Sequence, residues 1–526
     1  MITLIKKRKK HKMIKGGGHK GAKLLKFILL FIAGAISSLI FPPFAQSWAG
    51  YIALIGFFVF LFKKDRSLKE MFWATYVFGF SFFVVGFSWI NNALLTDGDQ
   101  FIAFVPLVML AIGLFFGLFW AIPALLTAKG NGIYEKMLLF CGGYVFMEWV
   151  RSFIFTGFPW NLLGTAFSFH PRMIQGASVI GTYGLSLLLL LLCCGMALIG
   201  ISIWQKKLYK GSFIFILLPA VCLFSFSFLY LPINELDGLK VRLVQPNIPQ
   251  TFKWQPALMY QNFRQYIDMS RVQPLDDVDM VVWGETATPY ILDRDEERLA
   301  EIKNAIPEKG YLVTGVLRIG HENGREVPYN SLFVINGDGD IKDYYDKSHL
   351  VPFGEFLPFR DYLPDFMEPV ASVVGDLGRG EKNKNITVSG LPLMGGAICY
   401  ESIFPHEVLN RVKKPEILLV LANDGWYGIS AGPYQHLAAA QMRAVEEGIT
   451  VVRSANTGIS AVILANGEIL GEIGLDVSGV TDVVLPKDLS QKTIYGCLGN
   501  VIPLGILLLM LVFVWGVRRY RNKISR

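Results

Sequence analysis

Leu393-Met-Gly-Gly-Ala-Ile-Cys399-Tyr400-Glu401 is a short apolar run that ends in a cysteine. Cys399 is the only cysteine between Pro232 and Tyr495. The run has the length of a buried strand, and strand ends are where α/β folds place reactive groups. If this region lies outside the cytoplasm, the thiol has no partner within its domain for a structural disulfide. Chemistry then becomes the leading reason for the cysteine.

The chain around this run has the composition of a membrane protein. Of its 526 residues, 52% are hydrophobic, 13% are aromatic and only 17% are charged. A bilayer core takes roughly 20 apolar residues per helix, and backbone polar groups in lipid must be satisfied within the segment. We therefore predict eight transmembrane helices, at about 24–41, 48–62, 71–93, 101–127, 137–155, 175–203, 212–231 and 498–517.

Basic residues mark every second connection between these segments. They cluster at Lys6-Lys7-Arg8-Lys9-Lys10, Lys63-Lys64-Asp65-Arg66, 129–136, Lys206-Lys207 and Arg518-Arg519-Tyr520-Arg521. Because basic loops stay in the cytoplasm, both termini are expected there. The predicted organisation is a basic cytoplasmic tail (1–23), seven transmembrane helices (24–231), an extracytoplasmic domain (232–497), an eighth helix (498–517) and a cytoplasmic tail (518–526).

The same clusters account for most of the net charge of +8. Nucleic-acid binding would need a basic patch on the extracytoplasmic domain, and its sequence has none. We therefore expect no nucleic-acid partner.

Short β-rich runs alternate with helical patterns in residues 232–497, which predicts an α/β layered fold. Asn336-Gly337 and Asn466-Gly467 are hairpin signals. The predicted strands are 239–245, 280–283, 311–316, 331–335, 341–345, 393–398, 417–422, 449–453 and 459–464. The predicted helices are about 256–272, 294–305, 402–411 and 434–447.

Three polar residues end or follow strands in this scheme: Glu285, Lys347 and Cys399. A thiol becomes a strong nucleophile once a base removes its proton and a nearby cation holds the resulting charge. Glu285 is the candidate base. Lys347 is expected to stabilise the thiolate and then the oxyanion, helped by the backbone N–H after the cysteine.

The motifs around these residues resemble those of the nitrilase superfamily. They are Trp283-Gly-Glu285-Thr-Ala-Thr-Pro289, Asp346-Lys347-Ser-His-Leu-Val-Pro-Phe-Gly-Glu355-Phe-Leu-Pro358 and Cys399-Tyr400-Glu401. With the opening Val244-Gln-Pro-Asn-Ile-Pro249 and the eight apolar segments, the chain resembles one membrane-bound family in particular, the bacterial apolipoprotein N-acyltransferases.

The resemblance implies a nitrilase-like αββα sandwich inserted between transmembrane helices 7 and 8 of an eight-helix bundle. It implies a bacterial inner-membrane enzyme with the sandwich on the periplasmic side. The implied reaction is a ping-pong transfer of a fatty acyl chain from a phospholipid, typically phosphatidylethanolamine, through a cysteine thioester. The acceptor is the N-terminal amino group of diacylglyceryl-cysteine on apolipoproteins. The resemblance implies no metal or cofactor, and we expect a monomer.

The resemblance also assigns roles by position. Glu285 matches the base, Lys347 the oxyanion-stabilising lysine and Cys399 the nucleophile. Glu355 matches a second acid, which either orients Lys347 or the base or forms a salt bridge that supports the loop. Tyr400 and Glu401 match the residues beside the nucleophile. Trp254 matches an aromatic in contact with substrate, with a core position as the alternative, and Trp426 lies in the matching loop 423–428.

Residues 353–375 have an apolar density unusual for a loop that faces water. The segment carries Phe353, Phe356, Leu357, Phe359, Tyr362, Leu363, Phe366 and Met367 among prolines. We hypothesise an interfacial arm that gates lipid entry, with Phe356 in contact with substrate. The alternative is a loop packed on the core.

Two other enzyme classes stay open from sequence. A membrane-tethered amidase would use the same three residues on a soluble amide, with water as the second nucleophile. A Cys-His hydrolase would use His349, His406 or His436 as base, but none of the three has an orienting partner evident in the sequence. A non-enzymatic scaffold is disfavoured because Glu285, Lys347 and Cys399 are all present.

Overall fold

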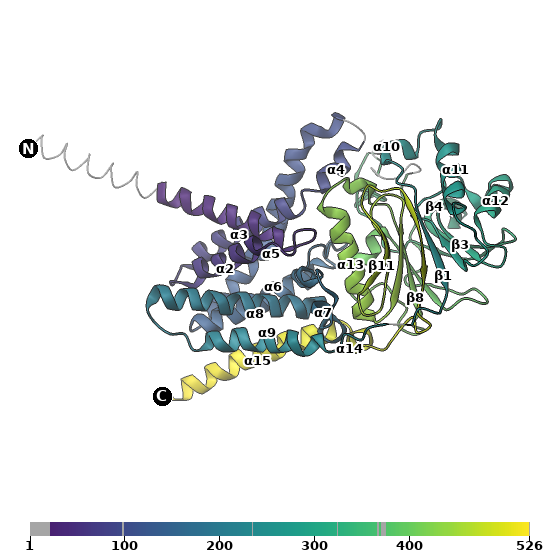
Figure 1. The fold of residues 1–526 in the computed structure, drawn as a ribbon. Coiled ribbons are helices and arrows are strands. Elements are labelled where there is room, and N and C mark those ends of the chain that lie inside the picture. Colours follow the sequence, from purple (N-terminus) through teal and green to yellow (C-terminus); the bar gives the residue numbers. More distant parts are fainter. Residues whose placement is uncertain are drawn as a thin grey trace, which may run out of the picture.

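The computed structural model describes residues 21–96, 99–233, 235–322, 324–364, 368–369 and 375–524. Apolar helices form a bundle on one side, and an α/β sandwich lies beside it (Figure 1). The first helix runs from Gly21 to Ile40. The other helices of the bundle side are α2 (Trp48–Phe62), α3 (Leu68–Gly86), α4 (Ile90–Leu95), α5 (Val105–Leu126), α6 (Ile133–Arg151), α7 (Pro171–Ile174), α8 (Ala177–Gln205), α9 (Gly211–Ser227), α14 (Ile494–Leu498) and α15 (Val501–Ile524).

By length and composition, five helices in the described ranges are able to cross a membrane, and α2 and α9 are shorter apolar helices. Helix α6 lies outside both groups because it carries Glu135, Lys136, Glu148 and Arg151. The expected segment 71–93 is divided, since α3 ends at Gly86 and α4 is a separate helix.

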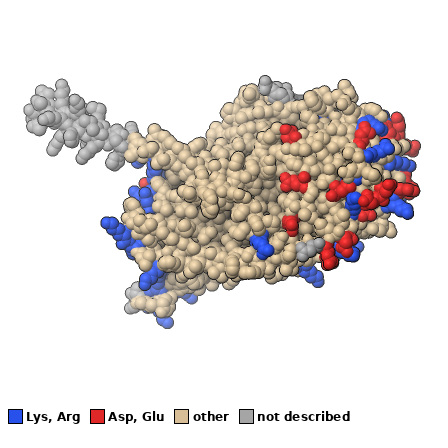
Figure 2. Space-filling model, in the orientation of Figure 1, with Lys and Arg blue, Asp and Glu red and all other residues tan. Residues whose placement is uncertain are grey.

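Charge is distributed unevenly over the surface. On the face shown in Figure 2, Lys and Arg gather at the end of the bundle far from the sandwich, while both signs mix on the outer side of the sandwich. The surface between these two ends is almost free of charged residues. Such a band poor in charge, with a basic border on one side, is typical of a membrane-embedded bundle.

The sandwich contains two six-stranded sheets with the orders β12-β1-β2-β3-β4-β5 and β11-β10-β9-β8-β7-β6. In the first sheet β1, β2 and β3 are parallel, and all other neighbours are antiparallel. The second sheet repeats this pattern, with β7, β8 and β9 parallel. The strands are β1 (Lys240–Gln245), β2 (Met280–Val282), β3 (Tyr311–Glu322), β4 (Arg325–Asn336), β5 (Ile341–Asp346), β6 (Asn385–Ile386), β7 (Met394–Ile398), β8 (Ile417–Ala422), β9 (Thr450–Ala455), β10 (Ser460–Ile463), β11 (Ile469–Ile473) and β12 (Gly479–Val484).

Helices cover the outer faces of both sheets, which gives the expected αββα layering. Helices α11 (Met259–Ser270) and α12 (Glu296–Ile302) pack on the first sheet, and α13 (Ala431–Glu447) lies between the second sheet and the bundle (Figure 1). A third apolar core fills the space between the sheets and includes Cys399 at its edge. The short helix α10 (Gln250–Lys253) follows β1.

Helix α13 joins the sandwich to the bundle through polar contacts. The Glu446 carboxylate accepts hydrogen bonds from the backbone N–H (2.7 Å) and hydroxyl (2.6 Å) of Thr182 in α8. Gly181 allows this contact because its positive φ of 67° kinks α8 just before Thr182. Near the other end of α13, the Trp160 indole donates to Gln435 Oε1 at 2.8 Å.

All nine expected strands and both hairpins are present, but one expected helix is wrong. In place of a helix at 402–411, the chain makes a 3-10 turn, Cys399–Ile403, and then leaves helical geometry. Phe404 is extended (φ −85°, ψ 113°) because it precedes Pro405, which disfavours the helical conformation. Strands β6, β11 and β12 were not predicted.

Candidate active site

Glu285 lies just beyond β2, where the two sheets approach each other closely. Its backbone N–H donates to the Ala422 carbonyl at the end of β8 (3.2 Å). The approach requires Gly284, because a Cβ there would lie 2.3 Å from the backbone nitrogen of Asn456. Thr286 has a positive φ of 44°, a strained conformation of the kind that is found at functional sites. The Glu285 side chain is thereby fixed at the mouth between the sheets, 7% exposed.

Lys347 follows β5 and is held between two carboxylates. Its ammonium lies 2.8 Å from Glu355 Oε1 and 3.4 Å from Glu285 Oε1, and the residue is 1% exposed. Burial by itself would lower the pKa of Lys347, but Glu355 and Glu285 outweigh it and hold the pKa above its usual value. Lys347 is therefore a fixed positive charge at neutral pH.

Glu355 combines both roles that the sequence left open. One oxygen accepts from Lys347, and the other accepts from the Val351 backbone N–H at 2.8 Å, which ties the loop to the carboxylate. Sequence reasoning missed Asn330, whose side-chain amide donates to Glu285 Oε1 (2.8 Å) and to Glu355 Oε1 (3.1 Å). An asparagine in the middle of the apolar strand β4 was the available signal, since buried amides need partners.

Cys399 follows β7 and opens the 3-10 turn with a positive φ of 51°. The residue is only 6% exposed. Burial raises the pKa of the thiol, the charge of Glu285 adds to this effect, and the charge of Lys347 opposes it. The resting sulfur is therefore a neutral thiol within the field of both side chains, and it needs a base before it can attack.

Glu401 and Tyr400 point away from the pocket and position the nucleophile's turn. Glu401 Oε1 accepts from the backbone N–H groups of Ser348 (2.8 Å) and His349 (2.9 Å), directly after Lys347. Its other oxygen accepts from the Ile398 N–H at 2.7 Å. Glu401 therefore connects the lysine loop to the cysteine turn. The Tyr400 hydroxyl donates to the Gly157 carbonyl on the bundle side.

A second buried lysine, Lys253, contacts the backbone of Glu285 and was not predicted. Its ammonium donates to the Glu285 carbonyl (2.9 Å) and to the Thr286 hydroxyl (2.7 Å). Burial lowers the pKa of Lys253 to about 8, although Glu285 and Cys399 partly offset that effect. The sequence signal was a lysine directly before the candidate Trp254.

A small cavity of about 50 Å³ lies beside Glu285 and Glu355, and neither Cys399 nor Lys347 is among its lining residues. Both tryptophans predicted to contact substrate line it, together with Gln250, Glu285, Thr286, Leu317, Asn330, Glu355, Leu377 and Asn423. The volume suits one or two water molecules and is too small for an acyl ester. Substrate entry therefore requires the lining to move.

The predicted arm is described only in part. Phe353, Phe359 and Tyr362 are exposed, whereas Leu357 is buried. Phe356 does not line the cavity, and the guanidinium of Arg379 lies 4.9 Å from its ring. Phe366 and Met367 lie outside the described residues.

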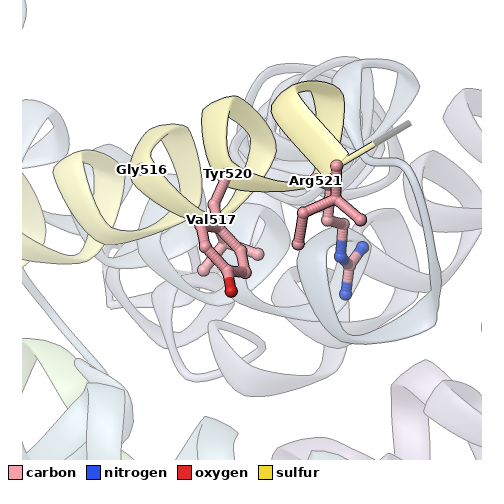
Figure 3. A pocket seen from close by; sticks show the side chains of 5 residues that line it. Gly516, Val517, Tyr520 and Arg521 are labelled. Atoms are coloured by element: carbon pink, nitrogen blue, oxygen red, sulfur yellow. The ribbon is translucent and has the colours of Figure 1, made fainter. Parts of the chain in front are cut away.

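Another hollow of about 490 Å³ lies at the far end of the bundle. Its lining side chains all come from α15 (Figure 3), and they are Gly516, Val517, Tyr520, Arg521 and Ile524. These residues lie on one exposed face of α15 and include none of Glu285, Lys347 and Cys399. We therefore do not assign this hollow to the candidate site.

The expectation that no histidine has an orienting partner is wrong. His436 Nδ1 lies 2.7 Å from Asp424 Oδ1. Its other ring nitrogen lies 2.9 Å from the carbonyl oxygen of Cys399. The pairing was invisible in sequence because Asp424 lies in a loop and His436 on the following helix.

The arrangement around Cys399 fits nucleophilic acyl chemistry. Glu285 is a carboxylate that can receive a proton, Lys347 is a permanent cation, and the buried thiol lies within the field of both. A dry site of this kind strengthens each electrostatic interaction with a developing oxyanion.

Comparison with known proteins places both halves of the chain in one family. An apolipoprotein N-acyltransferase N-terminal domain model matches residues 33–195, and a carbon-nitrogen hydrolase model matches residues 240–495. The apolipoprotein N-acyltransferase of Brucella melitensis is 37% identical over 484 residues, 87% of this chain and 89% of that protein. The apolipoprotein N-acyltransferase of Rhodopseudomonas palustris is 34% identical over 511 residues, 94% of this chain and 95% of that protein.

Among solved structures, Saccharomyces cerevisiae Nit3, a member of branch 10 of the nitrilase superfamily, is 22% identical. It covers 50% of this chain and 94% of its own, with a TM-score of 0.35. The first family model covers much of the helical bundle, and the second covers the sandwich that carries Glu285, Lys347 and Cys399. The chain belongs to the apolipoprotein N-acyltransferase family.

Proposed function

We propose that this enzyme transfers a fatty acyl chain from a phospholipid to the N-terminal amino group of diacylglyceryl-cysteine on apolipoproteins, through a thioester on Cys399. One observation carries the proposal. A buried ammonium, Lys347, is shared by Glu285 and Glu355 beside a buried neutral thiol. This is the charge pattern that a cysteine acyl carrier requires.

In the first half-reaction, Glu285 takes the thiol proton as Sγ attacks the ester carbonyl of the phospholipid. Lys347 and the backbone N–H of Tyr400 hold the resulting oxyanion. The C–O bond then breaks, and the lysophospholipid leaves with the proton that Glu285 returns. Because Lys347 stays charged at neutral pH, it acts as an electrostatic group, and Glu285 carries the proton.

In the second half-reaction, the amine of the acceptor attacks the thioester and Glu285 receives its proton. The C–S bond breaks, Lys347 stabilises the departing thiolate, and Glu285 returns the proton to sulfur. Both half-reactions therefore use the same groups, and ping-pong kinetics are expected because the lysophospholipid leaves before the acceptor attacks the acyl-enzyme.

We further propose that the eight apolar segments cross the bacterial inner membrane and that the sandwich lies on the periplasmic side. The basic end of the bundle in Figure 2 supports a cytoplasmic location for that end. Phosphatidylethanolamine is the proposed donor, and the chain acts as a monomer. The small resting cavity fits a site that opens only when lipid enters.

Intact-mass spectrometry of the protein purified from membranes tests the proposal. We expect a fatty-acyl adduct on the natural protein that is absent from Cys399→Ser and is discharged by a diacylglyceryl-cysteine peptide. Cys497→Ser is the matched control, because Cys497 is a free, exposed cysteine on α14. It should keep the adduct.

Two outcomes would overturn the proposal. An adduct that survives in Cys399→Ser would place the acyl group elsewhere. An adduct discharged by water as fast as by the peptide would make the enzyme a hydrolase.

A further inference from the structure

Three titratable side chains with no solvent exposure lie close to Cys399. They are Asp424 just after β8, His436 on α13 and Arg453 on β9. Arg453 Nη2 donates to Asp424 Oδ2 at 2.8 Å, and the other Asp424 oxygen faces His436 Nδ1 at 2.7 Å. Burying ionic groups this deeply costs desolvation free energy. A specific role therefore explains the presence of this cluster better than a contribution to stability alone.

The His436 ring is held between two hydrogen-bond acceptors. Nδ1 faces the Asp424 carboxylate, and Nε2 faces the Cys399 carbonyl oxygen at 2.9 Å. Because a carbonyl oxygen can only accept, a proton on Nε2 makes that nitrogen a donor to the Cys399 carbonyl. Nε2 also lies 3.0 Å from the Ser402 hydroxyl, and Nδ1 lies 3.1 Å from the Arg453 guanidinium. The Ser402 hydroxyl donates to the same carbonyl at 2.9 Å. The Cys399 carbonyl is therefore fixed by two donors.

That carbonyl belongs to the same planar peptide unit as the backbone N–H of Tyr400. In a trans peptide the C=O and the N–H point in opposite directions, so fixing one fixes the other. With the carbonyl bound to His436 on the inner side, the Tyr400 N–H is directed the opposite way. Polarisation of the carbonyl by its hydrogen-bond donors also makes the N–H a stronger donor. Cys399 itself has a left-handed φ of 51°, a conformation that persists only where the surrounding structure fixes it.

We propose that His436, oriented by Asp424 and Arg453, is a positioning residue for acyl transfer. It hydrogen-bonds to the Cys399 carbonyl and thereby directs the Tyr400 N–H toward the oxyanion. This inference rests on the proposed function, because only an acyl-transfer step develops an oxyanion there. His436 does not touch the acyl group, and it exchanges no proton with substrate.

A metal site is the competing explanation for the same cluster. Ligand atoms of Cys399, Asp424 and His436 lie within 4.8 Å of one another. However, Arg453 Nη2 lies 2.8 Å from Asp424 Oδ2 and 3.1 Å from His436 Nδ1. A cation bound between these residues would meet the guanidinium, so the cluster is built as an ion pair network.

Two neutral substitutions separate positioning from simple packing. In His436→Gln the side-chain amide can still reach the Cys399 carbonyl as a donor, whereas in His436→Asn it is too short. Each variant is measured for single-turnover thioester formation with phosphatidylethanolamine in mixed micelles, and for Cys399 alkylation by iodoacetamide. Alkylation needs the thiol but forms no oxyanion, so it is insensitive to the Tyr400 N–H.

We expect His436→Asn to slow thioester formation by about 100-fold, the loss typical of an oxyanion donor, and His436→Gln by about 10-fold. The lipid concentration that gives half the maximal rate should not change, and alkylation should change by less than about threefold in both. Ser402→Ala, which removes the smaller of the two donors, should slow thioester formation by about threefold. It serves as the test if both histidine variants fail to fold.

The inference is overturned if the Gln and Asn variants lose equal activity, or if alkylation falls in parallel with thioester formation. Unchanged thioester formation in Ser402→Ala together with unfolded histidine variants would also overturn it. Failure of the proposed function looks different, because the natural protein would then be alkylated at Cys399 but form no acyl adduct.

Discussion

The two sheets of the sandwich have the same strand order and directions, yet they place a carboxylate in two different environments. Glu285 follows β2, the middle parallel strand of the first sheet, and Asp424 follows β8, the middle parallel strand of the second. The two strand ends touch, since the Glu285 N–H donates to Ala422.

The neighbours of the two acids determine what each can do. Glu285 faces a small cavity and shares Lys347 with Glu355, so it can exchange a proton with a thiol. Asp424 is enclosed by Arg453 and His436. Burial would raise the pKa of Asp424, but those cations outweigh it and hold the pKa below its usual value. Equivalent positions thus hold a carboxylate beside a cavity in one half and a carboxylate within a buried ion cluster in the other.

The largest effect is expected from removing the charge of Glu285 in the first sheet. Glu285→Gln keeps the shape of the side chain and its bond from Asn330 but cannot accept the thiol proton. Thioester formation should fall by about 10³- to 10⁴-fold, with a thermal midpoint within a few degrees of the natural protein. Single-turnover acylation followed by mass spectrometry measures the rate. A loss below tenfold would mean that another group is the base.

In the second sheet, removing a charge from the Asp424 cluster is expected mainly to lower the stability of the protein. Arg453→Met leaves Asp424 buried with one cation fewer, and breaking a buried pair in this way costs about 3 to 5 kcal/mol. The measurement is the thermal midpoint in detergent. Arg318→Met is the control, because its ion pair with Asp346 is at a less buried position. Equal shifts of the thermal midpoint would show that the buried Asp424 cluster matters no more for stability than the Arg318–Asp346 ion pair.

Lys253, behind Glu285, predicts a pH dependence of stability. Its pKa of about 8 lies below the ordinary lysine value near 10.5, so between these values the unfolded chain binds more protons than the folded chain. The free energy of unfolding contributed by Lys253 therefore rises with pH across this interval, and the cost of the buried charge is complete below pH 8.

Lys253→Met removes that contribution. The thermal midpoint of the variant relative to the natural protein should be higher at pH 7 than at pH 10, by roughly 2 to 6 °C. Differential scanning at the two pH values measures it. A difference that does not vary with pH would show that the amine keeps its ordinary pKa.

The smallest effect is expected from the loops that follow β5 in the first sheet and β11 in the second. Residues 347–384 follow β5, whereas only 474–478 follow β11. If the longer loop contacts lipid, replacing its exposed Phe353 and Phe359 by serine should raise the lipid concentration for half-maximal acylation by about fivefold. The thermal midpoint should hardly move. Equal losses of lipid affinity and stability would instead indicate a loop packed on the core.

Much of the sandwich could be predicted because its strands are short apolar runs that end in turn residues. β7 and β8 are entirely buried, so their runs are continuous and easy to recognise. β11 and β12 escaped prediction because their residues are mostly half-buried and interrupted by glycine and charge. The helix predicted at 402–411 does not form. Pro405 disfavours the helical conformation at Phe404, and the chain instead makes a 3-10 turn that begins at Cys399.

By itself the sequence predicted the α/β class and the apolar segments, and it named Glu285, Lys347 and Cys399 as candidate residues. Each of these is encoded locally, by hydrophobic runs or by a motif of a few residues. The tertiary structure decided which groups surround them. Asn330, Lys253 and the Asp424–His436–Arg453 cluster reach the site from separate elements, and their contacts span distances in the chain that no local pattern records. A buried carboxylate such as Glu285 or Asp424 therefore acquires its electrostatic environment only when the fold has brought its neighbours together.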